Sequence, residues 1–162
     1  MYDTALMPLT ETDRDEATLA HLQSMLDHRG IGKVVLVRVV QPPPVTAVDY
    51  ALDPAVVAGL EKDLRRRAAS YLESVARRID WRGAGHAIEV VLGEPAEELA
   101  RLAEGRGADL ILLAPDPPSG IQRWFRGNLL DRLMGSARVP ITVLSGPAPW
   151  RRSQARAPRT AA

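Results

Sequence analysis

The residue types that most often carry out chemistry are sparse in this chain. There is no cysteine, and the three histidines, His21, His28 and His86, lack the spacing of metal ligands. The absence of cysteine excludes disulfides, thiol catalysis and Cys-ligated metals, and it is typical of proteins from a reducing compartment. The chain also lacks the nucleophile pattern G-x-S-x-G and the phosphate-binding patterns G-x-x-x-x-G-K-S/T and G-x-G-x-x-G. We therefore expect no metal site and no catalytic residue, so that the protein is not an enzyme.

Two acidic and two aromatic residues are the remaining candidates for chemistry. Glu97 and Glu98 are adjacent at the start of a predicted helix, and neighbouring helical positions do not face each other. They do not form an acid/base pair and instead complement the positive end of the helix dipole. Trp124 and Phe125 follow a predicted strand. They either pack under a loop at the sheet edge or stack against a ligand or partner.

Composition and charge limit the class of protein. The 162 residues are 46% hydrophobic and 25% charged, as in an ordinary globular domain. The net charge is +1, but residues 149–162 hold four arginines and no acid, which leaves residues 1–148 at about −3 and without a nucleic-acid signature. We expect one domain over residues 1–146 and a basic, disordered tail over residues 147–162, with contact to acidic partners as the alternative role of the tail.

The hydropathy pattern gives no sign of a membrane protein. No apolar run approaches the ~20 residues that a membrane span needs. The N-terminal residues MYDTALMPL lack the basic region of a secretory signal. We therefore expect a cytoplasmic protein with no membrane partner and no nucleic-acid partner.

Apolar strands alternate with amphipathic helices along the chain. The predicted strands are residues 4–9, 33–40, 86–92, 108–114 and 140–144, and the predicted helices are residues 13–29, 53–79, 96–104 and 127–137. Gly30 and Gly32 are expected to end the first helix, and Gly105 and Gly107 the third. This order predicts an α/β fold, an open doubly wound five-stranded parallel sheet with helices on both faces, of the Rossmann-like type. Ligands of such sheets bind beyond the carboxyl ends of the strands.

Over residues 3–145 the chain resembles the universal stress protein family. Residues 8–19 (PLTETDRDEATL) correspond to the family pattern P-T-D-G-S-x-x-S-x-x-A-L, and residues 36–40 (LVRVV) to L-L-H-V-V. Residues 93–103 (GEPAEELARLA) are similar to G-x-P-x-x-x-I-x-x-x-A, and residues 108–144 to the family's ending, A-D-L-I-V-M-G-x-x-G … G-S … P-V-L-V. The resemblance implies a non-catalytic regulatory or stress-response protein that acts through dimerisation and partner contact.

The resemblance also implies where a nucleotide would bind. Many members bind ATP through G-x-x-G, nine further residues and G-S/T. Here Ala114, Pro117 and Gly127-Asn128 fall at the matching positions, and only Gly127 is kept. The acidic residue that contacts adenine falls on Thr10, and a valine of the second strand is retained as Val39. The implied nucleotide-binding residues are Leu9, Thr10, Val39, Ala114, Pro117, Gly120, Gly127 and Asn128.

The altered loop predicts weak ATP binding or none. A phosphate cradle points backbone N–H groups at the anion, and Pro115, Pro117 and Pro118 have none to offer. Ser119, Gly120, Gly127 and Asn128 still fit a small-anion site. Three functions stay open: a regulatory protein with little or no ATP binding, a sensor that binds ATP, ADP or AMP through the degenerate loop, and a small hydrolase of a related fold. The missing catalytic set weighs against the third.

Two further expectations concern the last strand and one arginine. In the resembling family the last strand commonly pairs across a two-fold axis, so we expect a homodimer through Pro140 to Leu144, with a heterodimer as the alternative. Arg38 interrupts an apolar strand that is expected to be buried. It either pairs with an acid such as Glu11 or Asp116, or it supplies positive charge for a bound anion.

Overall fold

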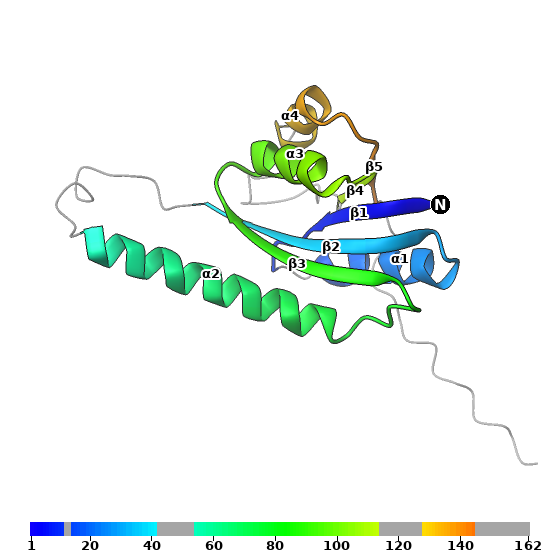
Figure 1. The fold of residues 1–162 in the computed structure, drawn as a ribbon, viewed down its shortest axis with the longest axis horizontal. Helices are drawn as coiled ribbons and strands as arrows, with labels where there is room; N and C mark the ends of the chain where they lie inside the picture. Colours follow the sequence, from blue (N-terminus) through cyan, green and yellow to red (C-terminus); the bar gives the residue numbers. More distant parts are fainter. Residues whose placement is uncertain (12–13, 42–53, 114–127, 145–162) are drawn as a thin grey trace, which may run out of the picture.

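Five strands and four helices alternate in the computed structural model, which describes residues 1–11, 14–41, 54–113 and 128–144 (Figure 1). The elements are β1 (Tyr2–Pro8), α1 (Arg14–Asp27), β2 (Ile31–Val40), α2 (Pro54–Ala76), β3 (Gly85–Leu92), α3 (Pro95–Arg106), β4 (Leu110–Leu113), α4 (Asn128–Ser136) and β5 (Ile141–Val143). Each predicted element is present, with bounds that differ from the prediction by three residues or fewer. The predicted basic tail lies outside the described residues.

The strands form one parallel sheet in the order β3-β2-β1-β4-β5. β1 is the central strand, and Ala5 lies beside Val34 of β2 and Leu110 of β4. The chain first moves outward from β1 through β2 to β3, and then returns to the other side of β1 for β4 and β5. This confirms the predicted doubly wound sheet.

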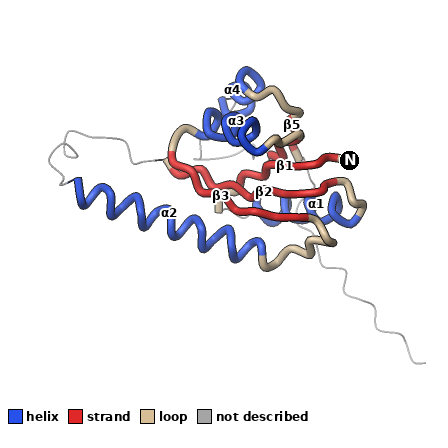
Figure 2. The backbone as a smooth tube through the Cα atoms, in the orientation of Figure 1, coloured by secondary structure: helices blue, strands red, loops and turns tan. Residues whose placement is uncertain are grey.

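Helices cover both faces of the sheet (Figures 1 and 2). On one face Ala5, Met7 and Leu36 pack with residues of α1 and α2, and on the other Leu6 and Val35 pack with residues of α3 and α4. Successive side chains of a strand point to opposite faces, so a strand buried on both faces must be apolar throughout. The run VVLV at residues 34–37, fully buried, meets this requirement.

The helix ends differ in part from the predicted glycine stops. In the turn after α1, Arg29 adopts the left-handed conformation (φ 52°), and the N–H of the following Gly30 donates to the Met25 carbonyl at 2.8 Å. Gly105 lies inside α3, so the prediction that it ends this helix is wrong. Gly105 keeps a helical backbone, so the helix continues through Arg106. It ends two residues after Gly105, at Gly107, which is left-handed (φ 60°) as predicted.

Helix α2 is longer than the sheet that it covers. Its buried residues are Ala68, Leu72 and Val75, while Val56 and Leu60 near its start are 58% and 48% exposed. The first turns of α2 therefore extend past the sheet, as Figure 1 shows. Within the parts of the chain that the structure describes, no helix has the length and apolar character of a membrane span.

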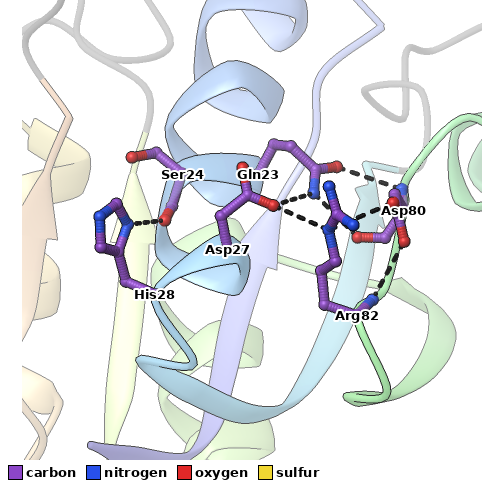
Figure 3. A network of polar contacts seen from close by, with 6 residues as sticks. All are labelled: Gln23, Ser24, Asp27, His28, Asp80 and Arg82. Carbon is purple, nitrogen blue, oxygen red and sulfur yellow. Dashed lines mark hydrogen bonds and ion pairs between the residues drawn. The ribbon is translucent and has the colours of Figure 1, made fainter.

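A polar network ties the end of α1 to the turn between α2 and β3 (Figure 3). The Gln23 amide donates to Asp27 Oδ1 at 3.2 Å and to the Asp80 carbonyl at 2.9 Å, and it accepts from the Asp80 N–H at 3.1 Å. Arg82 Nε lies 2.9 Å from Asp27 Oδ1 and 3.2 Å from Asp80 Oδ2. The hydrogen bond from Gln23, followed by that from Arg82, lowers the pKa of Asp27 below its usual 3.8.

The lowered pKa of Asp27 predicts a stability term that depends on pH. A carboxyl with a depressed folded-state pKa stabilises the fold above its unfolded pKa, and this contribution disappears as the pH falls through the folded value. We expect Asp27→Asn to be less stable than the parent at pH 6, and the difference to shrink below about pH 4. Gln23→Ala should show the same trend, and urea unfolding at several pH values measures both. Parallel curves for the parent and Asp27→Asn would contradict the prediction.

Candidate functional site

A cavity of about 1050 Å³ opens at the carboxyl edge of the sheet. Its floor is formed by residues 8–11 after β1 and residues 38–41 at the end of β2. Its walls are seven residues of α2 between Leu64 and Ser74, Pro95 and Leu99 of α3, and Leu129 of α4. This is the position at which doubly wound sheets bind ligands.

The cavity brings three of the predicted nucleotide-binding residues together. Leu9, Thr10 and Val39 all contribute to its lining. Leu9 is buried, and its N–H donates to the Val37 carbonyl at 2.8 Å, which continues the sheet beyond the last residue of β1. The ends of β1 and β2 therefore meet as parallel pairing requires.

The other predicted nucleotide-binding residues are not placed. Ala114, Pro117, Gly120 and Gly127 lie outside the described residues, as do Asp116 and the pair Trp124 and Phe125. Asn128 begins α4, whose next residue, Leu129, lines the cavity. The phosphate-binding half of the predicted site stays a prediction.

Arg38 is held at the floor of the cavity by two partners. Its Nη1 donates to the Leu9 carbonyl at 3.1 Å, and its Nη2 lies 3.9 Å from Glu11 Oε2. The predicted pairing with Glu11 is confirmed. The strand that Arg38 interrupts is buried over residues 34–37, as expected, but burial decreases toward its carboxyl end and the Arg38 side chain is 24% exposed.

Glu11 adopts a backbone conformation that favours glycine. Its φ is 62°, in the left-handed region where a side chain is disfavoured by about 1–2 kcal/mol. The fourth position of the family pattern P-T-D-G-S is glycine, and it falls on Glu11. The chain therefore keeps the turn that glycine would make and uses the side chain to pair with Arg38.

Helix α2 supplies a wall that sequence reasoning missed. Leu64, Arg67, Ala68 and Tyr71 recur at helical spacing and line the cavity together. Arg66 and Arg67 are exposed, and both are among the lining residues. The signal was present in the spacing, since Arg67 lies three residues from Leu64 and four from Tyr71.

The opposite wall depends on how α3 begins. The Glu94 carboxylate caps α3 by accepting from the N–H groups of Ala96 and Glu97 at 2.9 and 3.2 Å. Arg132 of α4 pairs with Glu94 at 2.9 Å and with Glu97 at 3.3 Å, which fixes α4 against this helix end. Gly93 precedes the cap with a φ of 148°, and a Cβ there would lie 2.9 Å from Glu98 Cγ, so only glycine fits.

The acidic residues of α3 behave as their sequence positions predict. Glu97 and Glu98 both lie in the first turn, where they complement the helix dipole. Glu97 pairs with Arg132, whereas Glu98 pairs with Arg101 at 2.7 Å. Because their partners differ, the two carboxyls do not act as one pair.

Groups with unusual titration or ring contacts lie away from the cavity. Burial of Asp109 disfavours its charged form, but hydrogen bonds from the Asp3 and Thr4 N–H groups outweigh this and lower its pKa. Asp109 and Asp27 both lie at the amino edge of the sheet, opposite the cavity. The His86 ring stacks on Trp81, with ring centroids 4.3 Å apart. The described residues hold no cluster of metal-binding side chains.

Comparisons with known proteins agree with the observed fold. The model of the universal stress protein family matches residues 1–145. Universal stress protein MJ0577 of Methanocaldococcus jannaschii is 21% identical over 89% of this chain and 95% of that protein. Universal stress protein MJ0531 of the same organism is 27% identical, over 52% of this chain and 49% of that protein, so this match spans about half of each.

Solved structures share the architecture at low sequence identity. The structure of MJ0577 has a TM-score of 0.72 and 19% identity, covering 92% of this chain and 99% of that one. A universal stress protein in complex with cAMP has a TM-score of 0.61 and 17% identity, covering 89% and 97%. One from Archaeoglobus fulgidus in complex with dAMP has a TM-score of 0.54 and 17% identity, covering 89% and 98%.

The left-handed backbone at Glu11 predicts that glycine suits this position better than alanine. Glu11→Gly and Glu11→Ala both remove the ion pair with Arg38, but only alanine keeps a Cβ in the strained conformation. We expect Glu11→Gly to be more stable than Glu11→Ala by about 1 kcal/mol in urea unfolding. Arg29, also left-handed, offers the matched control, where glycine should exceed alanine by a similar amount. Equal stability of the two Glu11 variants would refute this account of the turn.

Proposed function

The chain belongs to the universal stress protein family, and we propose that it is a non-catalytic regulatory member that acts through dimerisation and partner contact, with weak binding of ATP or none. The observation that supports this proposal is the contrast between two parts of the expected nucleotide site, the cavity at the ends of β1 and β2 and the phosphate-binding loop of the family pattern. The half formed by β1 and β2 is an open cavity, while three of the four phosphate-loop positions depart from the family pattern. A triphosphate would lose the N–H donors on which this binding mode depends.

The arrangement of the described residues supports a binding role over a catalytic one. Nucleophilic catalysis needs a hydroxyl or thiol with a base in hydrogen-bond reach. The histidines lie outside the described lining of the cavity, and the Ser74 hydroxyl is engaged by the Tyr71 carbonyl at 2.7 Å. A location in the cytoplasm and the lack of membrane and nucleic-acid partners stay predictions from composition.

A nucleotide sensor is the second candidate, and the cavity favours it. A volume of about 1050 Å³ is enough for a mononucleotide, since typical ligand sites measure ~300–1,000 Å³. The solved relatives in complex with cAMP and with dAMP share this fold. In this reading an adenine nucleotide uses the retained β1 and β2 side of the site and makes little use of the degenerate loop.

The proposed dimer uses the free edge of β5. Among the residues that the structure describes, this strand pairs with β4 alone and lies at the end of the sheet. Val143 is 41% exposed and Met134 of the neighbouring α4 is 68% exposed, so apolar surface accompanies the strand edge. An edge with free N–H and C=O groups readily pairs with another strand. A second copy or a relative with the intact glycine motif would fit equally.

Restoring the phosphate loop should raise the affinity for ATP. The triple variant Ala114→Gly, Pro117→Gly and Asn128→Ser returns a donor, a closer backbone approach and a hydroxyl to the loop. Recovery of even one or two hydrogen bonds to a charged phosphate predicts a gain of roughly tenfold or more in calorimetric titration with Mg-ATP. Pro42→Gly, which changes a proline outside the loop, is the control and should leave the affinity unchanged. Tight, Mg-dependent ATP binding by the parent would overturn the proposal.

A proline at Val143 should break the dimer without breaking the sheet. The Leu144 N–H donates to the Leu113 carbonyl of β4, and alternate residues of a strand point their N–H groups to opposite sides. The Val143 N–H therefore faces the free edge. We expect Val143→Pro to sediment as a monomer at tens of micromolar, roughly the range of a weak dimer, while Val143→Thr, which keeps the N–H, stays dimeric. A monomeric parent at this concentration would refute the predicted interface.

A further inference from the structure

The described lining of the cavity is positively charged. Arg38, Arg66 and Arg67 contribute to it, while Glu11 is the one carboxylate among the described lining residues. Arg66 pairs with Asp63, outside the lining, at 2.9 Å. Arg67 approaches the cavity from α2, and Arg38 approaches it from β2, where its Nη2 is paired with Glu11 at a distance of 3.9 Å. Such a surface suits an anionic ligand.

Among the lining arginines, Arg67 is the one whose guanidinium has no carboxylate partner in the described part of the chain. It has no ion pair with any other residue that the structure describes, although Arg66 beside it does. Its helical position, three residues after Leu64 and four before Tyr71, places it on the face of α2 that lines the cavity. A guanidinium without a carboxylate partner keeps all five N–H donors for water or a ligand.

Arg38 is oriented but only partly engaged. Its Nη1 bond to the Leu9 carbonyl fixes the side chain at the floor, whereas Nη2 is 3.9 Å from the Glu11 carboxylate, the outer limit of an ion pair. An anion entering the cavity can take the place of Glu11 at Nη2 without breaking the bond to Leu9. Arginine presents a planar fork that matches a phosphate better than it matches a single distant oxygen.

From these observations we infer that the cavity holds the phosphoryl group of a small phosphomonoester between Arg38 and Arg67, on the α2 side of the cavity. The inference rests on the proposed nucleotide-sensing function, and it names the group that would be recognised and the residues that recognise it. The apolar part of the ligand packs on Leu9, Val39 and Leu99, which lie in the same lining.

The test compares ligands that differ only in the phosphate. Calorimetric titration of the full chain with AMP, adenosine and inorganic phosphate separates a nucleotide site from a site for phosphate alone. We expect AMP to bind at least roughly tenfold more tightly than adenosine, because a charge-assisted hydrogen bond contributes about one such factor. Inorganic phosphate should compete with AMP, and binding of phosphate without any preference for AMP would identify a free-phosphate site.

Three variants assign the phosphate to its arginines. Arg67→Gln and Arg38→Gln should each lose the preference for AMP over adenosine, and Arg67→Lys should restore part of this preference. Arg65→Gln is the matched control, since Arg65 is a neighbour on α2 that does not line the cavity. Thermal unfolding without ligand verifies that all variants are folded, and Arg67, at an exposed helix position, can be changed without loss of the core.

The outcomes separate the inference from the function on which it rests. If neither adenosine nor AMP binds, the nucleotide-sensing function is wrong and the inference falls with it. If adenosine and AMP bind equally, or if Arg67→Gln behaves like Arg65→Gln, the inference is overturned while a nucleoside site in the cavity stands.

Discussion

The central constraint on this structure is that β1 must pair on both sides and bury both faces. Ala5, Leu6 and Met7 have no exposed surface, and each lies in a strand with a parallel neighbour on either side. Parallel neighbours need long crossover connections, which place helices on both faces of the sheet. The carboxyl ends of β1 and β2 are then brought together at one edge, and the cavity is the space that the crossovers leave there. The cavity and the hydrophobic core are consequences of the same strand pairing.

The fold was predictable because continuous apolar, β-branched runs such as residues 34–37 are typical of strands buried on both faces of a parallel sheet. The site was less predictable, since it depends on the positions of side chains that no short sequence pattern determines. The floor residues Leu9, Thr10 and Val39 were found from the resemblance, and the structure brings them together. That Arg38 bonds to the Leu9 carbonyl depends on the register of β1 against β2. The contribution of Arg67 depends on which face of α2 meets the sheet, and this is set by Ala68, Leu72 and Val75. Helix ends were the least predictable feature, since Arg29 does at the end of α1 what glycine was expected to do.

Proteins hold a phosphate in two physically different ways, through backbone N–H groups or through guanidinium groups. Backbone N–H groups at a helix start are fixed by the fold, and their interaction with phosphate costs no side-chain ordering. Guanidinium groups on long side chains carry a full charge but must be ordered, and at an exposed helix surface salt screens them. A site that binds an anion through arginine side chains selects its ligands less strictly by shape, and its affinity depends more on ionic strength. The loss of loop donors and the presence of lining arginines would therefore change the kind of ligand as well as the affinity.

The overhang of α2 has a consequence for local stability. A helix turn without tertiary contacts unfolds easily, because isolated short helices are marginal in water. Val56 and Leu60 near the start of α2 are exposed, whereas Ala68, Leu72 and Val75 are buried in the core. Amide hydrogen exchange should therefore be fast in the first turns and slow beyond Ala68. Arg67 lies at the boundary between the exposed and the buried segment of α2. A ligand bound to Arg67 would therefore slow amide exchange in the turns next to it. The exchange rates at the start of α2 would then measure how fully the cavity is occupied.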